Sequence, residues 1–398
     1  MNRNIPTQQH IKSMHLKEIF LAALHSGGTS RAHLKQELHL SFPSVSALVD
    51  ELLVNHVLLE TDVRETPERG RPRTVLRINP KALAIPVLVM TREGYHCAVY
   101  DCAANCLEEG FLPFSPDVQV NRPHTGRWHP SAETLCAPLQ AWSRRISRMY
   151  RMSDLLLVVP GTANEAEGLS SSALQMTATK EFLPRLTQIT GWNVIVQSNS
   201  DCCAYAEKIC RSLSEDFIYI YIGKGVGAGI IRSGKVFQNQ GRRAGEIGHI
   251  SIHYNGRTCS CGRKGCLESY ISTTAITQDT RNVLTDPSKS VTTFQDVCAA
   301  YASGNPALAQ LLREKAQLLS VGIHNMLSMQ PVSHVILGGE IEQLGPDFLA
   351  LVQTSLQERS HHTGTAISYT TQVSGAESLG AVWNYLDHLM EIERMFPA

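Results

Sequence analysis

Three cysteines crowd into eight residues near the middle of the chain, in the C-x-C-x4-C spacing of Cys259, Cys261 and Cys266. Gly262 and Gly265 lie between them and allow the backbone to turn sharply enough for three thiolates to face one point. Three thiolates and a fourth protein donor are typical of a tetrahedral zinc site. We therefore predict a closed, structural Zn²⁺ site, because four protein ligands leave no position for a reactive water.

Two histidines upstream are candidates for the fourth ligand. We expect His249 and His253 to lie on one face of a strand, where side chains alternate, so spacing alone does not choose between them. The alternative to a metal site is a trio of buried, reduced cysteines. The chain holds eleven cysteines, an odd number that favours reduced thiols over a disulfide framework.

Composition limits the kinds of partner. The chain of 398 residues is 43% hydrophobic and 18% charged, so it can bury large cores and divide into two or three domains. Basic and acidic residues both number 36, so net charge offers no general attraction to nucleic acid or anionic lipid. The sequence has no run of eighteen apolar residues and no signal peptide. We expect a cytoplasmic protein without membrane insertion, whose contact with nucleic acid comes from a local patch.

Residues 1–80 have the pattern of three short helices. Apolar residues three and four apart mark the first, and Ser30 and Ser41 are expected to cap the second and third. This layout predicts a winged helix-turn-helix domain whose third helix enters the major groove of DNA. The residues expected to contact DNA here are Arg31, Phe42, Ser44, Ser46 and Ala47. A helical docking domain is the alternative, since ten basic and eight acidic residues leave this region nearly neutral.

A run of arginines follows, with Arg69, Arg71 and Arg73 around a glycine and a proline. Such a segment is slim and extended, so its guanidinium groups can enter a narrow minor groove beside the reading helix. A solvated linker is the alternative. Proline content and the loss of apolar periodicity place a domain boundary near residue 80.

Beyond residue 80, strand-like runs alternate with helical stretches, as in α/β domains. The expected strands are a hairpin at 87–90 and 97–100, followed by runs at 155–159, 194–196, 217–222, 229–231 and 335–337. Several end in glycine turns, which places functional groups at strand C-termini around one cleft.

The residues Gly245-Glu246-Ile247-Gly248-His249, followed by the cysteine motif and Glu268, resemble the signature of the ROK family (repressors, open reading frames and kinases). The resemblance runs from about residue 16 to the C-terminus, and the helix-turn-helix makes the chain similar to the repressor branch. It implies a two-lobed, actin-like sugar-kinase fold, with lobes over 81–200 plus 380–398 and over 201–379. It also implies zinc on four residues and a sugar cleft bordered by three: the ligands are His249, Cys259, Cys261 and Cys266, and the cleft residues are Glu246, His249 and Glu268.

The chain departs from the kinases of this family in two places. Their Asp-x-Gly-x-Thr phosphate loop is replaced by Met90-Thr91-Arg92-Glu93-Gly94-Tyr95. Their Asn-Asp pair, counted back from Glu207, is replaced by Ser198 and Asn199. An amide holds a sugar hydroxyl but cannot deprotonate it at neutral pH, and Asp201 takes the base role only in a shifted alignment. We interpret the glycine turns at 223–229 and 338–339 as remnants of the kinase fold, and expect no catalytic residue.

We therefore expect a repressor of carbohydrate uptake or metabolism genes that binds a double-stranded DNA operator. A homodimer or homotetramer would place two reading helices in successive major grooves. A sugar or sugar-phosphate effector held by Asn199, Glu246, His249 and Glu268 would shift the angle between the lobes. The alternatives are an ATP-dependent sugar kinase with a DNA-binding appendage, and a repressor controlled by a protein partner of the sugar-transport system.

Overall fold

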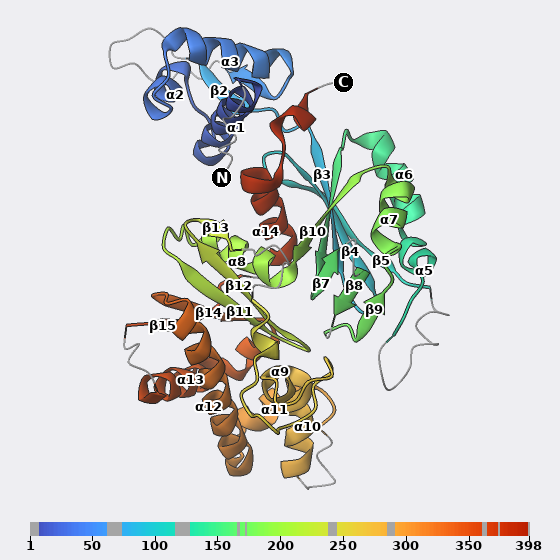
Figure 1. Ribbon diagram of the computed structural model, residues 1–398, viewed down its shortest axis with the longest axis vertical. Helices are drawn as coiled ribbons and strands as arrows, with labels where there is room; N and C mark the ends of the chain where they lie inside the picture. The colour runs from blue at the N-terminus through green and yellow to red at the C-terminus, as the bar shows by residue number, and fades with distance from the viewer. Residues whose placement is uncertain are drawn as a thin grey trace, which may run out of the picture.

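The computed structural model describes residues 8–61, 74–115, 128–164, 168–171, 173–237, 245–284, 291–359, 364–372 and 375–396. Figure 1 shows a small helical part at the N-terminus and two larger lobes. Each lobe is built on a five-stranded sheet. This is the expected fold class, a winged helix-turn-helix followed by a two-lobed, actin-like body. Within the described residues, no helix is long and apolar enough to span a bilayer.

The N-terminal part, here called the reader, comprises residues 8–61 and 74–78. Its elements are α1 (Gln8–Ser26), α2 (Arg31–Glu37), α3 (Phe42–Val54) and a wing of β1 (Leu58–Thr61) and β2 (Val75–Ile78). The Ser30 hydroxyl accepts a hydrogen bond from His33 N, and the Ser41 hydroxyl accepts one from Ser44 N. Both caps satisfy N–H groups that a helix leaves free, so the predicted helix starts are confirmed.

The first lobe is a mixed sheet covered on both faces. Its main elements are β3 (Ala84–Met90), β4 (Gly94–Asp101), β5 (Cys106–Pro113), α5 (Ala132–Cys136), α6 (Leu139–Met149), β6 (Asp154–Val159), α7 (Phe182–Thr190) and β10 (Asn193–Ser198). A small second sheet holds β7 (Thr162–Asn164), β8 (Gly168–Ser171) and β9 (Met176–Ala178). The large sheet has the order β10-β6-β3-β4-β5, with β3 antiparallel to β4 and parallel to β6. The predicted hairpin is confirmed, and α5, α6 and α7 bury the face that carries Leu88.

The second lobe has the strand order β13-β12-β11-β14-β15. Its strands are β11 (Phe217–Ile222), β12 (Val226–Arg232), β13 (Lys235–Val236), β14 (His334–Gly338) and β15 (Ala366–Tyr369). Its helices are η1 (Ile247–His249), α9 (Glu268–Ile271), α10 (Thr273–Val283), α11 (Phe294–Ala302), α12 (Pro306–Met329), η2 (Glu340–Leu344) and α13 (Gly345–Arg359). These helices bury the β11 side chains Ile218 and Ile220 with Leu319 of α12 in one core.

Two helices lie between the sheets, α8 (Asn199–Cys210) and α14 (Ala376–Asn384). They approach so closely that a Cβ on Gly380 of α14 would lie 1.8 Å from the carbonyl oxygen of Cys202 in α8. Only a glycine allows this contact between backbones, so the two helices form one rigid pair.

The chain ends in a segment that returns to the reader, made of η3 (Tyr385–Leu389) and η4 (Ile392–Met395). Tyr385 and Met395 share one hydrophobic cluster with Phe20 of α1 and with Val87 of the first sheet. The reader therefore packs directly on the C-terminal segment (Figure 1). The division of the chain at residues 80, 200 and 380 stays a prediction.

Candidate metal centre and interlobe cavity

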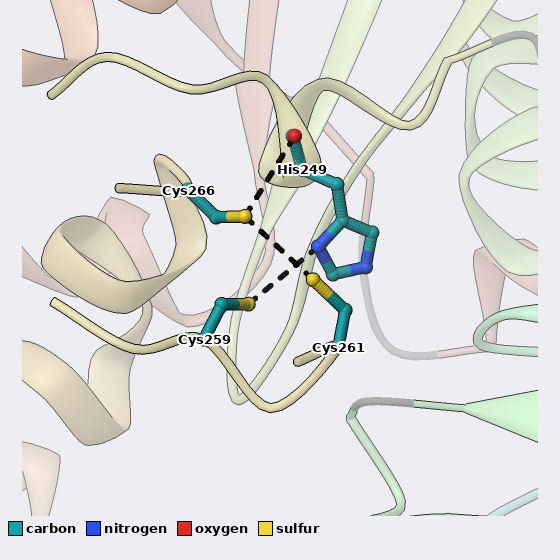
Figure 2. A group of neighbouring side chains, drawn as sticks. All are labelled: His249, Cys259, Cys261 and Cys266. Carbon is teal, nitrogen blue, oxygen red and sulfur yellow. Dashed lines mark hydrogen bonds between the residues drawn. The ribbon is translucent and has the colours of Figure 1, made fainter. Parts of the chain in front are cut away.

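One imidazole and three cysteine sulfurs point toward a common centre in Figure 2. The donor atoms of His249, Cys259, Cys261 and Cys266 all lie within 4.8 Å of one another. Cys261 Sγ lies 3.7 Å from Cys266 Sγ, and Cys259 Sγ lies 3.7 Å from His249 Nδ1. With metal–sulfur bonds of about 2.3 Å, tetrahedral zinc separates its ligand atoms by roughly 3.8 Å. The four side chains therefore fit a tetrahedral metal ion.

The loop that carries the cysteines is closed by its own backbone. Cys259 N donates a hydrogen bond to Arg263 O at 2.8 Å, and Gly265 N donates to Arg257 O at 2.8 Å. Gly265 adopts φ +74°, and a Cβ there would lie 1.8 Å from the His253 carbonyl oxygen. This position requires glycine, because the tight turn brings the third cysteine back to the first two.

The three thiols do not ionise alike. Burial raises the pKa of Cys259 and of Cys266, so both favour the neutral form. Burial also acts on Cys261, but hydrogen bonds from Arg263 and from the two neighbouring thiols outweigh it and lower its pKa. Cys261 therefore carries negative charge most easily, and a bound dication would ionise its neighbours as well.

The expected strand through 249–253 is wrong. The backbone instead forms the 3₁₀ turn η1, in which His249 N donates to Glu246 O at 3.0 Å and Ile250 N to Ile247 O at 3.1 Å. These bonds take the N–H groups of His249 and Ile250 that a strand would give to a neighbour. Further along, Ile252 N donates to Gly265 O at 2.8 Å, in an isolated bridge between Ser251 and Cys266. The turn directs His249 to the cysteines, whereas His253 Nδ1 lies 3.4 Å from the Tyr270 hydroxyl.

Glu268 ties the cysteine loop to the second sheet. Its Oε2 accepts a hydrogen bond from Val226 N at 3.1 Å, and its Oε1 accepts one from the Ser260 hydroxyl at 3.3 Å. The side chain is 6% exposed. Ser260 lies between two of the clustered cysteines, so the geometry of the cluster and the position of Glu268 depend on each other.

A cavity of about 800 Å³ lies between the lobes, at the ends of their strands. Its wall includes Thr91 after β3, Pro160 after β6, Asn199 after β10, Lys224 after β11 and Glu340 after β14. The prediction that strand C-termini surround one cleft is thus confirmed. The start of α14 adds Glu377 and Ser378, which no local sequence pattern indicated.

The predicted effector residues divide between two places. Among the described residues that line the cavity, Asn199 is the one member of that set. Glu246, His249 and Glu268 belong instead to the metal loop and the turn before it. Asp201, the alternative base, lies one half-turn further along α8, is 8% exposed, and is absent from the described cavity wall.

The turn between β3 and β4 is closed by Thr91. The Thr91 hydroxyl accepts hydrogen bonds from Glu93 N at 3.2 Å and Gly94 N at 3.1 Å. A phosphate-binding loop needs such backbone N–H groups to be free for the phosphate oxygens. Here the side chain of the turn itself occupies two of them.

The predicted reading helix presents its N-terminal residues to solvent. Phe42 is 49% exposed, Ser44 and Ala47 are also exposed, and Ser46 is half-buried. Val45 and Val49 on the other side of α3 are buried in the reader core. A large apolar side chain with this exposure at a helix start is available to a partner surface.

Arg31 lies beside that surface but is engaged within the reader. Its guanidinium donates to Asp50 Oδ1 at 2.7 Å and to Glu60 Oε1 at 2.6 Å. It therefore links α2 to α3 and to the wing. The other predicted arginines, Arg69, Arg71 and Arg73, lie outside the described residues.

Comparison with known proteins identifies the family of the chain. The model of the ROK family matches residues 131–386, which include the strands and helices of the second lobe, the part of the first lobe from α5 to β10, and the whole cysteine motif. The chain belongs to the ROK family. Among curated ROK relatives, the DNA-binding transcriptional dual regulator NagC of Escherichia coli K12 is 20% identical, over 88% of this chain and 86% of its own length.

Solved ROK structures have the same fold. A transcriptional regulator described as a homolog of the Escherichia coli Mlc protein superposes with a TM-score of 0.80 at 23% identity, covering 97% of this chain and 99% of its own. The ROK hexokinase of Thermus thermophilus superposes with a TM-score of 0.61 at 19% identity, covering 76% of this chain and 97% of its own. The likeness to the regulator thus extends over a larger share of the chain.

Proposed function

We propose that this ROK protein is a cytoplasmic, DNA-binding repressor of genes for carbohydrate uptake or metabolism. A sugar or sugar phosphate between the lobes controls DNA binding, and the protein transfers no phosphoryl group. One observation carries the proposal: a reader with an exposed reading-helix N-terminus is joined to kinase-like lobes whose base position, Asn199, is an amide.

The DNA contacts follow from the reader. Phe42, Ser44, Ser46 and Ala47 lie at the end of α3 that enters a major groove in helix-turn-helix proteins. Arg31 stays in the proposed DNA-contact set as the residue that orients α3 relative to the wing, through its bonds to Asp50 and Glu60. The arginine segment at 69–73 enters the adjacent minor groove. A homodimer or homotetramer supplies two readers to one operator. The name of the relative NagC, a DNA-binding transcriptional dual regulator, supports DNA as the partner.

Two features of the cavity support the absence of catalysis. Asn199 can hold a hydroxyl of the sugar but cannot accept its proton at neutral pH. The Thr91 hydroxyl blocks the backbone N–H groups with which the first turn would bind the phosphates of ATP. With these two features, the cleft binds a sugar but does not phosphorylate it.

The metal of this proposal is zinc, bound by His249, Cys259, Cys261 and Cys266. Four protein ligands close the site, so zinc holds the loop in shape and takes no part in chemistry. Through Ser260, the loop fixes Glu268, whose other oxygen binds Val226 N. Val226 adjoins Gly225 of the cavity wall, so Glu246, His249 and Glu268 stay in the proposed effector set as residues that shape this border.

Titration of the purified protein against DNA from its own upstream region tests the proposal. We expect preference for one site over competitor DNA, with affinity falling steeply as salt rises, because Lys and Arg displace counterions from phosphates. Equal affinity for all sequences would remove the proposed function.

Coupled kinase assays with glucose, mannose, N-acetylglucosamine and N-acetylmannosamine test whether the protein transfers a phosphoryl group. We expect no phosphorylation of any of them. The same sugars and their phosphates can be screened by thermal shift, since a ligand that binds the native state raises the melting temperature. If none does so while DNA binding is specific, control passes to a protein partner.

A further inference from the structure

Asp387 of η3 lies where three parts of the chain meet. His25 Nε2, from α1 of the reader, lies 3.0 Å from Asp387 Oδ1, and the hydroxyl of Tyr205, from α8, donates to Asp387 Oδ2. Asp387 is 7% exposed and Tyr205 is fully buried, whereas the His25 side chain is 47% exposed. One buried carboxylate therefore joins the reader to a helix that begins at the cavity.

Neighbouring contacts strengthen this junction. The His25 ring stacks on Trp383 of α14, with centroids 5.6 Å apart and planes at 24°. Lys17 Nζ, also on α1, donates to Met390 O at 2.8 Å, and Lys208 Nζ on α8 donates to the Tyr205 hydroxyl at 2.9 Å. The Ser13 hydroxyl, also on α1, donates to a carboxylate oxygen of Glu393. Three polar side chains of α1 thus fasten the reader to the C-terminal segment.

Asp387 is ionised at neutral pH despite its burial. Burial raises the pKa of its carboxyl, but hydrogen bonds from His25 and Tyr205 and the nearby charge of Lys208 outweigh this and lower it. Its hydrogen bonds are therefore charge-assisted, which makes them stronger than bonds between neutral groups.

The other end of the same helices forms the cavity wall. Asn199 is the first residue of α8, and Glu377 and Ser378 lie in the first turn of α14. Tyr205 follows Asn199 by six positions, a rise of about 9 Å along the helix. Because the backbones of α8 and α14 touch at Gly380, neither helix can shift without the other.

We propose that Asp387 is a positioning residue that couples the α8–α14 pair to the reader, so that a ligand which displaces the cavity ends of these helices reorients the reading helix. This rests on the proposed function, because it assigns the effector to the cavity. The ligand acts only if it binds two orientations of the pair unequally. The tests therefore measure how a change at the junction affects helices α1 and α8 and the DNA affinity of the reader.

Hydrogen exchange of the full chain, without DNA or sugar, tests the junction. Asp387→Asn removes the charge that joins His25 to Tyr205. We expect amide exchange in both α1 and α8 to become roughly tenfold faster, because weakening a buried hydrogen bond lowers the free energy of local opening by the equivalent of about that factor. Asp50→Asn is the matched control, because Asp50 pairs with Arg31 inside the reader, and it should leave α8 unchanged. Faster exchange in α1 alone, with α8 as in the parent, would overturn the proposal.

Operator binding tests whether a ligand in the cavity changes the DNA affinity of the reader through this junction. The ligand is the sugar that gives the largest thermal shift in the screen above. We expect His25→Ala to reduce the sugar-induced change in DNA affinity to less than twofold. His15→Ala is the control on the same helix, since His15 pairs only with its neighbour Glu18 in the described structure, and should keep the parent's response. An unchanged response in His25→Ala also overturns the coupling. A parent without operator preference refutes the proposed function instead, and the exchange experiment still decides the junction.

Discussion

The choice between two histidines gives the sharpest test of the metal centre. His249 Nδ1 lies 3.7 Å from a cysteine sulfur, whereas His253 Nδ1 faces the Tyr270 hydroxyl. We predict that His249→Gln weakens zinc binding and that His253→Gln does not. Both changes remove one imidazole from the same short stretch of chain, so they form a matched pair.

The size of the effect follows from the closed ligand set. Structural zinc sites with four ligands bind with about 12 kcal/mol, so one ligand of four is worth about 3 kcal/mol. A loss of 3 kcal/mol corresponds to a rise in Kd of roughly a hundredfold. Two of the ligand spacings are 3.7 Å, close to the separation in a tetrahedral site.

Competition with a chromogenic chelator measures the Kd, and metal analysis after dialysis measures the stoichiometry. We expect about one zinc per chain for the parent and for His253→Gln, and far less for His249→Gln and for Cys261→Ser. Cys298→Ser controls for the loss of a thiol, because Cys298 lies outside the cluster. A parent-like Kd for His249→Gln, or a metal-free His253→Gln, would refute the ligand assignment.

Three further predictions concern stability and DNA binding. Asp279→Asn leaves the buried Lys315 ammonium without its anion and should cost about 3 kcal/mol in urea unfolding. Burial raises the pKa of Asp279, but Arg257 and Lys315 outweigh it and lower the pKa. The stability that the Asp279 carboxylate contributes is therefore present above about pH 5 and is lost on acidification. A stability difference between the parent and Asp279→Asn that does not change with pH would contradict this. Ala47→Glu, on the exposed face of α3, should abolish specific DNA binding in gel-shift titrations, because a carboxylate there is repelled by DNA phosphates. The melting temperature should stay within about 1 °C of the parent, because Ala47 is exposed. Retained binding would exclude α3 as the reading helix. Gly380→Ala places a Cβ against the Cys202 carbonyl and should lower stability by about 2 kcal/mol or more, whereas a stable variant would show that the helix pair is not rigid.

Local patterns were sufficient where neighbours in the chain decide the structure. The caps at Ser30 and Ser41, and the buried face that includes Phe20 and Val49, depend on residues within a few positions of each other. The replacement of the kinase base by Asn199 is likewise visible in the sequence, because the inability to accept a proton is a property of the amide side chain itself. Periodicity and capping therefore predicted the reader before any tertiary contact was known.

Local patterns failed where a turn competes with a strand. The stretch from His249 to His253 alternates as a strand would, yet the N–H groups of His249 and Ile250 bond to residues three positions back, and only a single bridge forms beyond them, between Ser251 and Cys266. Only the resemblance to a family selected His249. The arrangement of η1 against the cysteine loop is what separates the two imidazoles.

The order of residues along this chain thus determined the three helices of the reader, several strands of the two lobes and the cysteine motif, because these follow from interactions over short separations. Tertiary structure alone decided that His249 joins the cysteines, that Glu340 and Glu377 reach one cavity with Asn199, and that the chain returns to pack on its own first helix. The contact of His25 with Asp387 spans 362 residues. No periodicity encodes such a pair, because it exists only once two distant segments have been brought together by the packing of everything between them.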